Sequence, residues 1–220
     1  SEMCIRDRVL GVYISGHPLE EYVATLEKNI TRTTADFEVV DGETEPKVKD
    51  QERAVIGGMI TGRTVKATRT NNMMAFLTVE DLYGTVEVIV FPRDYEKYRT
   101  LLEEDAKVFI QGRVTVEEDK PAKLICSGVV PFDAVEKELW IQFLTRADYE
   151  EAEQTLFAIL GNYDGIENVY IYLSKDRARK LLPKSRCTKV CKELLSELYT
   201  KFGEDNVKVT EKSIEKKFRA

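Results

Sequence analysis

The chain has 220 residues, which is enough for one large domain or two small ones. Its 43% hydrophobic and 33% charged residues are typical of a folded globular protein and exclude a disordered tail. No apolar run approaches the roughly 18 residues needed to span a membrane, and no signal peptide opens the chain, so we expect a cytoplasmic protein without a membrane partner.

The first predicted element is a helix that begins at Pro18, has acidic residues in its first turn and ends near Lys28. Residues 1–8 resemble a translated sequencing adapter, so we attach no function to them. We therefore interpret residues 1–28 as a short helical segment. Residues 29–52 are polar and acidic and contain glycine and proline, which predicts a linker.

In residues 53–131 the hydrophobic period changes to two, which predicts β-strands. A helical pattern after Pro92 separates the third strand from the fourth. Three strands, a helix and two more strands, the first long and bent by glycines, predict a five-stranded OB-fold barrel. Its interior is too narrow for a ligand, so the outer face and the loops are its usable surface. The predicted strands are Ala54–Lys66, Met74–Glu80, Thr85–Phe91, Lys107–Val116 and Lys123–Val130.

Residues 136–215 alternate between strand and helix patterns and predict a small, separate α/β domain. The whole chain is therefore expected to be mixed β and α/β. One stretch of this domain, Glu153–Phe157, is similar to the short peptides that bind sliding clamps. It lies within an amphipathic helix, however, so we favour core packing for its apolar residues.

Charge is unevenly distributed in this chain of net charge −6. No acid lies between Arg53 and Val79, whereas eight basic residues face a single acid between Lys175 and Lys192. Two local basic zones in an acidic protein form a modest charge pattern. The second zone fits a phosphate patch, a docking surface for an acidic partner, or a solvated linker and helix face.

The nucleic-acid interpretation rests on the loop between the first two barrel strands, which is basic and free of acids. In OB-folds this loop and the loop between strands four and five flank a groove for single strands. Glu87 on the outer face, and 11 basic against 11 acidic residues between positions 53 and 130, weigh against it. The candidate contacts are Arg63, Lys66, Arg69, Asn71, Asn72, Phe76, Arg113, Lys120 and Lys123.

No motif of catalysis is present. The acidic clusters at residues 80–81, 103–105 and 117–119 fall at the ends of predicted elements, where carboxylates normally lie in water. Around His17 the G-x-S-x-G frame of a nucleophile elbow is missing, and the chain has no glycine-rich phosphate loop. We therefore assign no catalytic residues.

Four cysteines are too few and too scattered for a disulfide scaffold. Cys187 and Cys191 form a C-x3-C pair without a second pair, and a zinc site needs about four ligands. We therefore expect reduced thiols, no metal and no other cofactor.

Two blocks, "SGHPL" at residues 15–19 and "DLYGTVEVIVFP" at residues 81–92, together resemble the C-terminal part of the bacterial replicative DNA polymerase III alpha subunit family. The resemblance implies an OB domain near single-stranded template DNA and a last domain that contacts the clamp-loader tau subunit. It also implies a partnership with the rest of the alpha chain. The family's catalytic aspartates have no counterparts here, so we expect a non-catalytic fragment of a DNA-directed polymerase.

Two other classes of protein share the predicted strand pattern. The anticodon-binding OB domain of a class II aminoacyl-tRNA synthetase should continue into a catalytic domain of several hundred residues, and only about 90 follow the barrel here. A protein-interaction module without nucleic-acid contact remains compatible with the balanced charge of the barrel.

Overall fold

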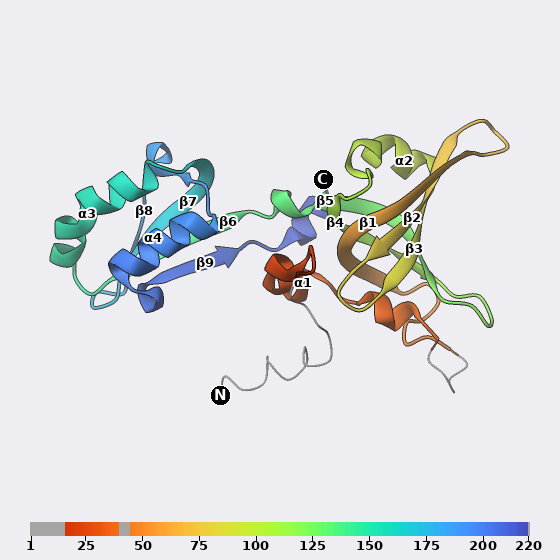
Figure 1. The fold of residues 1–220 in the computed structure, drawn as a ribbon, viewed down its shortest axis with the longest axis horizontal. Helices are drawn as coiled ribbons and strands as arrows, with labels where there is room; N and C mark the ends of the chain where they lie inside the picture. Colours follow the sequence, from red (N-terminus) through yellow and green to blue (C-terminus); the bar gives the residue numbers. More distant parts are fainter. Residues whose placement is uncertain (1–15, 40–44, 220) are drawn as a thin grey trace. The chain divides into compact units, whose positions relative to one another are not determined.

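The computed structural model describes residues 16–39 and 45–219, so the adapter-like residues 1–8 lie outside the described part. The chain divides into two compact units (Figure 1). The first contains Ser1–Ala134 together with Ser213–Ala220, and the second contains Val135–Lys212. The predicted second domain extended to residue 215, whereas the unit ends at Lys212 because the last segment packs against the first unit.

The first unit is a closed five-stranded barrel of order β1-β2-β3-β5-β4, which confirms the predicted OB-fold (Figure 1). All neighbours pair antiparallel except β3 and β5, which are parallel. A short helix, α2 (Pro92–Tyr98), follows β3 and begins at a proline, as helices often do. The strands are β1 (Arg53–Ala67), β2 (Met73–Glu80), β3 (Thr85–Val90), β4 (Lys107–Thr115) and β5 (Lys123–Pro131).

The barrel is filled by the alternate apolar side chains that its strand patterns predicted. Leu77, Val88 and Ile110 are almost fully buried in this core. Gly58 and Gly112 allow neighbouring backbones to approach closely, because an added Cβ at either position would lie 2.3 Å from a carbonyl oxygen. The interior therefore holds side chains and leaves the outer face for binding.

Residues 29–52, predicted as a linker, are part of the barrel unit. The 3-10 turn Thr34–Phe37 carries Phe37 into the barrel core, where only 1% of it is exposed, and Val48 is buried beside it. The Ala122 backbone N–H donates to the Phe37 carbonyl at 2.8 Å. The linker prediction was therefore wrong for these residues, because two isolated apolar side chains among acids produce no periodic pattern.

Asp81, predicted to be solvated, is a buried carboxylate in the β2–β3 turn and is 6% exposed. It accepts hydrogen bonds from the backbone N–H groups of Tyr83 at 2.8 Å and Gly84 at 3.2 Å. It also accepts from the Thr34 N–H at 2.8 Å and from the Thr34 hydroxyl. One carboxylate therefore closes the hairpin and fastens the 3-10 turn to it.

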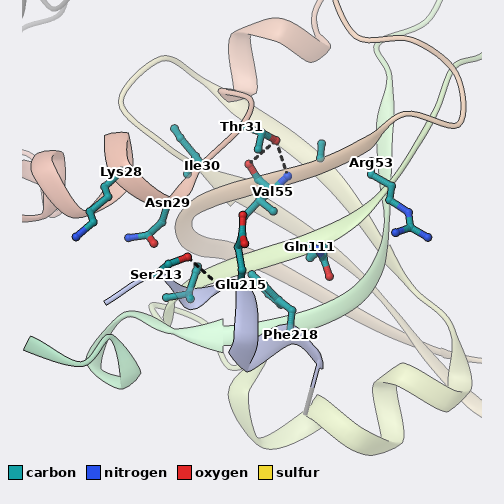
Figure 2. A pocket seen from close by; sticks show the side chains of 12 residues that line it. Lys28, Asn29, Ile30, Thr31, Arg53, Val55, Gln111, Ser213, Glu215 and Phe218 are labelled. Carbon is teal, nitrogen blue, oxygen red and sulfur yellow. Dashed lines mark hydrogen bonds between the residues drawn. The ribbon is translucent and has the colours of Figure 1, made fainter. Parts of the chain in front are cut away.

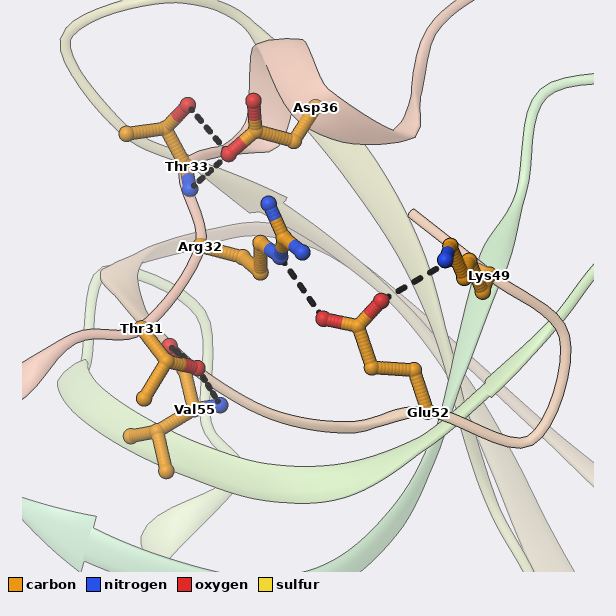
Figure 3. A network of polar contacts seen from close by, with 7 residues as sticks. All are labelled: Thr31, Arg32, Thr33, Asp36, Lys49, Glu52 and Val55. Atoms are coloured by element: carbon orange, nitrogen blue, oxygen red, sulfur yellow. Dashed lines mark hydrogen bonds and ion pairs between the residues drawn. The ribbon is translucent and has the colours of Figure 1, made fainter. Parts of the chain in front are cut away.

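A second polar network holds the chain just before β1 (Figure 3). Thr31 extends the edge of β1: its N–H donates to the Val55 carbonyl, and its hydroxyl accepts from the Val55 N–H, both at 2.9 Å. Arg32 Nε contacts Glu52 Oε1 at 2.7 Å, and the Lys49 N–H donates to the same carboxylate at 3.0 Å. The Arg32 hydrogen bond lowers the pKa of Glu52.

The predicted N-terminal helix is present and belongs to the barrel unit. A 3-10 turn, Glu20–Tyr22, leads into α1 (Val23–Asn29). Leu19 and Leu26 are buried, and a Leu26 methyl group lies close to Gly57 of β1. None of the described helices is long and apolar enough to cross a membrane.

The second unit is a four-stranded sheet of order β8-β7-β6-β9 with two helices. β6 pairs parallel with β7, and the other pairs are antiparallel. The strand β8 was not predicted, because its residues belong to the basic run after Lys175 and none of them is buried. The elements are β6 (Lys137–Phe143), α3 (Arg146–Leu160), β7 (Asp164–Leu173), β8 (Ala178–Leu181), α4 (Lys192–Phe202) and β9 (Val207–Glu211).

Replacing Asp81 with alanine should lower the free energy of unfolding by about 2–4 kcal/mol, because buried donors lose a charged acceptor. Chemical denaturation of the full chain would measure this. Glu118→Ala, at an exposed acid in the β4–β5 loop, is the control and should change the stability by less than about 0.5 kcal/mol. Equal effects of the two substitutions would contradict the assigned role of Asp81.

The Arg32–Glu52 pair should stabilise the fold in a pH-dependent manner. Because the pKa of Glu52 is lowered in the folded state, its contribution is present above the ordinary glutamate value of about 4.5 and is lost as the pH falls through the folded value. At neutral pH the free energy of unfolding of the wild type should exceed that of Glu52→Gln by up to about 1 kcal/mol. The difference is small because the pair is partly exposed. Denaturation at neutral pH and at about pH 3 should show this difference shrinking. A difference that does not change with pH would refute the assignment.

Candidate nucleic-acid interface

The candidate surface begins on the outer face of β1 and β2. Phe76 lies opposite Thr64 in the strand register, and its half-buried ring faces outward because its neighbours Ala75 and Leu77 are buried. The Lys66 ammonium lies 5.3 Å from the centre of this ring, in a cation–π contact. The structure therefore brings together two of the sequence-predicted residues, an aromatic face and a cation.

Residues paired in register on the neighbouring strands extend this outer face around the barrel. Phe76 lies opposite Ile89 of β3, and Ile89 lies opposite Ile125 of β5. Ile125 in turn lies opposite Arg113 of β4, which is opposite Arg53 of β1. A half-buried apolar strip therefore runs from Phe76 to two exposed arginines.

The turn between β1 and β2 presents Arg69 to solvent on a closed loop. The Thr68 N–H donates to the Asn72 carbonyl at 2.8 Å, and the Asn71 N–H donates to the Thr68 carbonyl at 2.9 Å. Asn71 has a φ of 61°, in the left-handed region that asparagine tolerates better than most residues. The Asn72 amide donates to Thr70 Oγ1 at 3.1 Å. Both asparagines therefore shape this loop, which exposes Arg69.

Arg63 does not lie on the outer face. A bulge between Ile60 and Gly62 changes the strand's parity, so Arg63 lies opposite the inward-facing Leu77. Its guanidinium contacts Glu103 at 2.6 Å and the Tyr95 hydroxyl at 3.0 Å. The prediction that Arg63 and Lys66 share a loop was wrong, because both lie within β1 and an odd separation places them on opposite faces.

The β4–β5 loop places its two predicted lysines beside acids. Lys120 contacts Glu117 at 2.6 Å, and Lys123 contacts Glu87 at 2.9 Å. The Glu87 hydrogen bond raises the pKa of Lys123. This pair neutralises Glu87, the acid that weighed against binding on the outer face. Beside it lies a groove of about 290 Å³, between this loop, β3 and the Phe37 segment.

A second hollow, of about 410 Å³, lies where α1, β1 and the C-terminal turn Ile214–Arg219 meet (Figure 2). Lys28 and Arg53 lie at opposite ends of its lining, with Glu215 between them (Figure 2).

Within residues 16–39 and 45–219, no group of three or more histidine, cysteine or acidic side chains could hold a metal ion. The three cysteines in that part are free, and burial raises the pKa of Cys126 to about 12.

Comparison with known proteins finds similarity both in the barrel and over longer stretches of the chain. Residues 54–132 match the tRNA_anti-codon family model, described as an OB-fold nucleic acid binding domain. Three DNA polymerase III alpha subunits also match. That of Aquifex aeolicus is 35% identical over 61% of this chain and 11% of its own length. That of Borreliella burgdorferi is 28% identical over 76% of the chain and 15% of its own length. That of Bacillus subtilis is 26% identical over 93% of the chain and 18% of its own length.

Over much of its length the chain is similar to DNA polymerase III alpha subunits. It spans less than one fifth of the length of these relatives, so the activity, substrates and partners of the whole polymerase are proposals for it. A solved structure, an OBody bound to hen egg-white lysozyme, is 18% identical over 47% of this chain and 92% of its own. The TM-score between the two structures is 0.37.

Sequence reasoning omitted Ile89, Ile125 and Arg53 from this surface. The outward direction of Ile89 was visible in the alternation of β3, because valines flank it on both sides. Its contact with Ile125 was not visible, because β3 and β5 pair in parallel across an intervening helix and strand. Only the closed barrel shows that the two isoleucines join Phe76 and Arg113 in one strip.

Arg63→Met should lower the free energy of unfolding by about 1–2 kcal/mol, because the Tyr95 hydroxyl and Glu103 lose their partner. Lys66→Met is the matched control, since it removes an exposed cation three residues along the same strand. It should change stability by less than about 0.5 kcal/mol. Urea denaturation would measure both, and a larger effect at Lys66 would reverse the assigned roles.

Proposed function

We propose that the barrel binds single-stranded DNA on the outer face of β1 and β2, as a non-catalytic part of a replicative DNA polymerase III alpha subunit. The observation that carries this proposal is the Lys66–Phe76 pair beside the exposed Arg69 turn. A base can stack on an aromatic face of this kind for about 1–3 kcal/mol, and neighbouring cations attract phosphates. The strip through Ile89 and Ile125 extends the stacking face toward Arg113.

The charges of this face favour weak, salt-sensitive binding. Lys66, Arg69, Arg113 and Arg53 are exposed cations along it, whereas Lys120 and Lys123 are paired with acids. About three phosphate contacts would give a log–log salt slope near −2, at roughly −0.7 per phosphate on a single strand. The template strand of a replicating polymerase is the ligand that this face and the similarity to DNA polymerase III alpha subunits together favour.

The second unit has a surface suited to partner docking, and we assign it the tau contact that the family resemblance implies. Leu144 is 65% exposed at the end of β6, beside a hollow of about 540 Å³ lined by Phe143 and Phe202. An exposed apolar residue at the rim of a hollow is typical of interaction surfaces. The other proposed partner is the rest of the alpha chain, in the bacterial cytoplasm.

The test is fluorescence anisotropy of a labelled single-stranded DNA oligonucleotide titrated with the full chain at several salt concentrations. We expect a log–log salt slope near −2. The double variant Lys66→Glu/Arg69→Glu should weaken binding and make the slope shallower by about 1.4, which corresponds to the loss of two phosphate contacts. Phe76→Ala should weaken binding at least about fivefold, whereas Phe76→Tyr, which keeps the ring, should not.

A charge-matched control separates the site from general electrostatics. Arg93→Glu/Lys97→Glu reverses two exposed cations on α2 and changes the net charge equally. If this variant weakened binding as much as Lys66→Glu/Arg69→Glu, the attraction would be nonspecific. No binding at low salt would refute the proposal and favour a barrel that contacts only proteins.

A further inference from the structure

None of the described helices of the second unit packs on one face of its sheet. Both α3 and α4 pack on the opposite face, where Leu156 and Leu194 join the core with Leu139 and Ile141 of β6. Side chains alternate along a strand, and residues paired in register share a face. The uncovered face therefore contains three rows that cross the strands. They are Thr210, Glu138 and Asn168, then Lys208, Trp140, Tyr170 and Leu181, then Gln142, Tyr172 and Arg179.

The centre of this face is an ordered aromatic pair. The Trp140 and Tyr170 rings stack with their centroids 4.3 Å apart and their planes 8° from parallel. The indole orientation is fixed by a hydrogen bond from Trp140 Nε1 to Thr210 Oγ1 at 3.1 Å. Leu181, at the end of the same row, is 51% exposed, so the apolar surface continues to the sheet edge.

Cations lie at both edges of the aromatic centre. Exposed Lys208 is the β9 neighbour of Trp140, and exposed Arg179 is the β8 neighbour of Tyr172. The acid on this face, Glu138, lies 3.7 Å from the Lys212 ammonium, which reduces its repulsion of an anion.

Arg179 belongs to the basic run of residues 175–192, and two other cations of this run pack against aromatic rings of the helix layer. Lys180 lies 4.9 Å from the Tyr149 ring centre, and the Arg186 guanidinium lies 4.2 Å from that of Phe157. Only part of the basic run is therefore available to an anionic ligand, and Arg179 is the member that reaches the aromatic face.

We propose that this sheet face is a second binding site for single-stranded nucleic acid, separate from the barrel and independent of the barrel's function. Bases extend the Trp140–Tyr170 stack, while phosphates contact Lys208 and Arg179. Neighbouring β-strands are about 4.8 Å apart, which places these two cations about 14 Å apart across the sheet. A short single-stranded oligonucleotide can therefore contact both. An acidic peptide would use the cations but would gain little from the stacked rings, which favours nucleic acid.

Trp140 is the chain's single tryptophan, so its fluorescence reports on this face. Titrating the full chain with a 15-nucleotide oligothymidylate at low salt should quench it saturably, with a log–log salt slope of about −1.4 for two phosphates. Arg179→Glu/Lys208→Glu should abolish the quenching. Arg146→Glu/Lys201→Glu, with the same charge change on exposed residues of α3 and α4, should preserve it.

Three further measurements test whether the bases stack on Tyr170, whether the two sites are independent, and whether the ligand is a nucleic acid. Tyr170→Ala should weaken binding at least about fivefold and Tyr170→Phe should not, because only the ring is needed for stacking. The barrel variant Lys66→Glu/Arg69→Glu should leave the quenching unchanged, so either site can fail without the other. Absence of quenching, or quenching that the sheet-face reversal leaves intact, would overturn the proposal. Equal quenching by poly-glutamate would overturn it in favour of an acidic peptide.

Discussion

The Asp81 carboxylate is the interaction on which the rest of the barrel unit depends. Removing a carboxylate from water is costly unless hydrogen bonds replace its hydration, and Asp81 accepts from three backbone N–H groups and one hydroxyl. Because Thr34 supplies two of these donors, the carboxylate joins the β2–β3 turn to a segment 47 residues earlier. That segment carries Phe37 into the end of the core, so one polar group determines how an apolar barrel is closed.

A single bulge in β1 assigns separate roles to its basic residues. The extra residue between Ile60 and Gly62 shifts the alternation, so Arg63 contacts α2 while Lys66 lies over Phe76. Without the bulge the two side chains would exchange faces, and the outer surface would lose the cation beside its aromatic ring. The bulge therefore connects the closure of the barrel to the chemistry of its surface.

The parts of the structure that the sequence predicted are those determined by local periodicity. The five barrel strands and the two helices of the second unit each repeat an apolar residue at a fixed interval, and the structure confirms them within a few residues. Phe37 and Asp81 were misinterpreted because their partners are distant in sequence, and β8 was missed because both of its faces are polar or exposed. At the candidate site, the outward direction of Phe76 followed from alternation. Lys66 was predicted in a loop and lies within β1, and the position of Arg63 depends on a one-residue bulge that the sequence pattern did not indicate.

The net charge of −6 limits how this chain can engage an anionic polymer. Few exposed cations lie on either proposed binding face, so neither site offers more than about four phosphate contacts. Such sites are weak as isolated surfaces. Tethering changes this, because a site linked to an enzyme already on DNA meets its ligand at an effective concentration in the millimolar range. Weak, aromatic-centred patches of the proposed kind would therefore act best when they are tethered to a second site that already holds the nucleic acid.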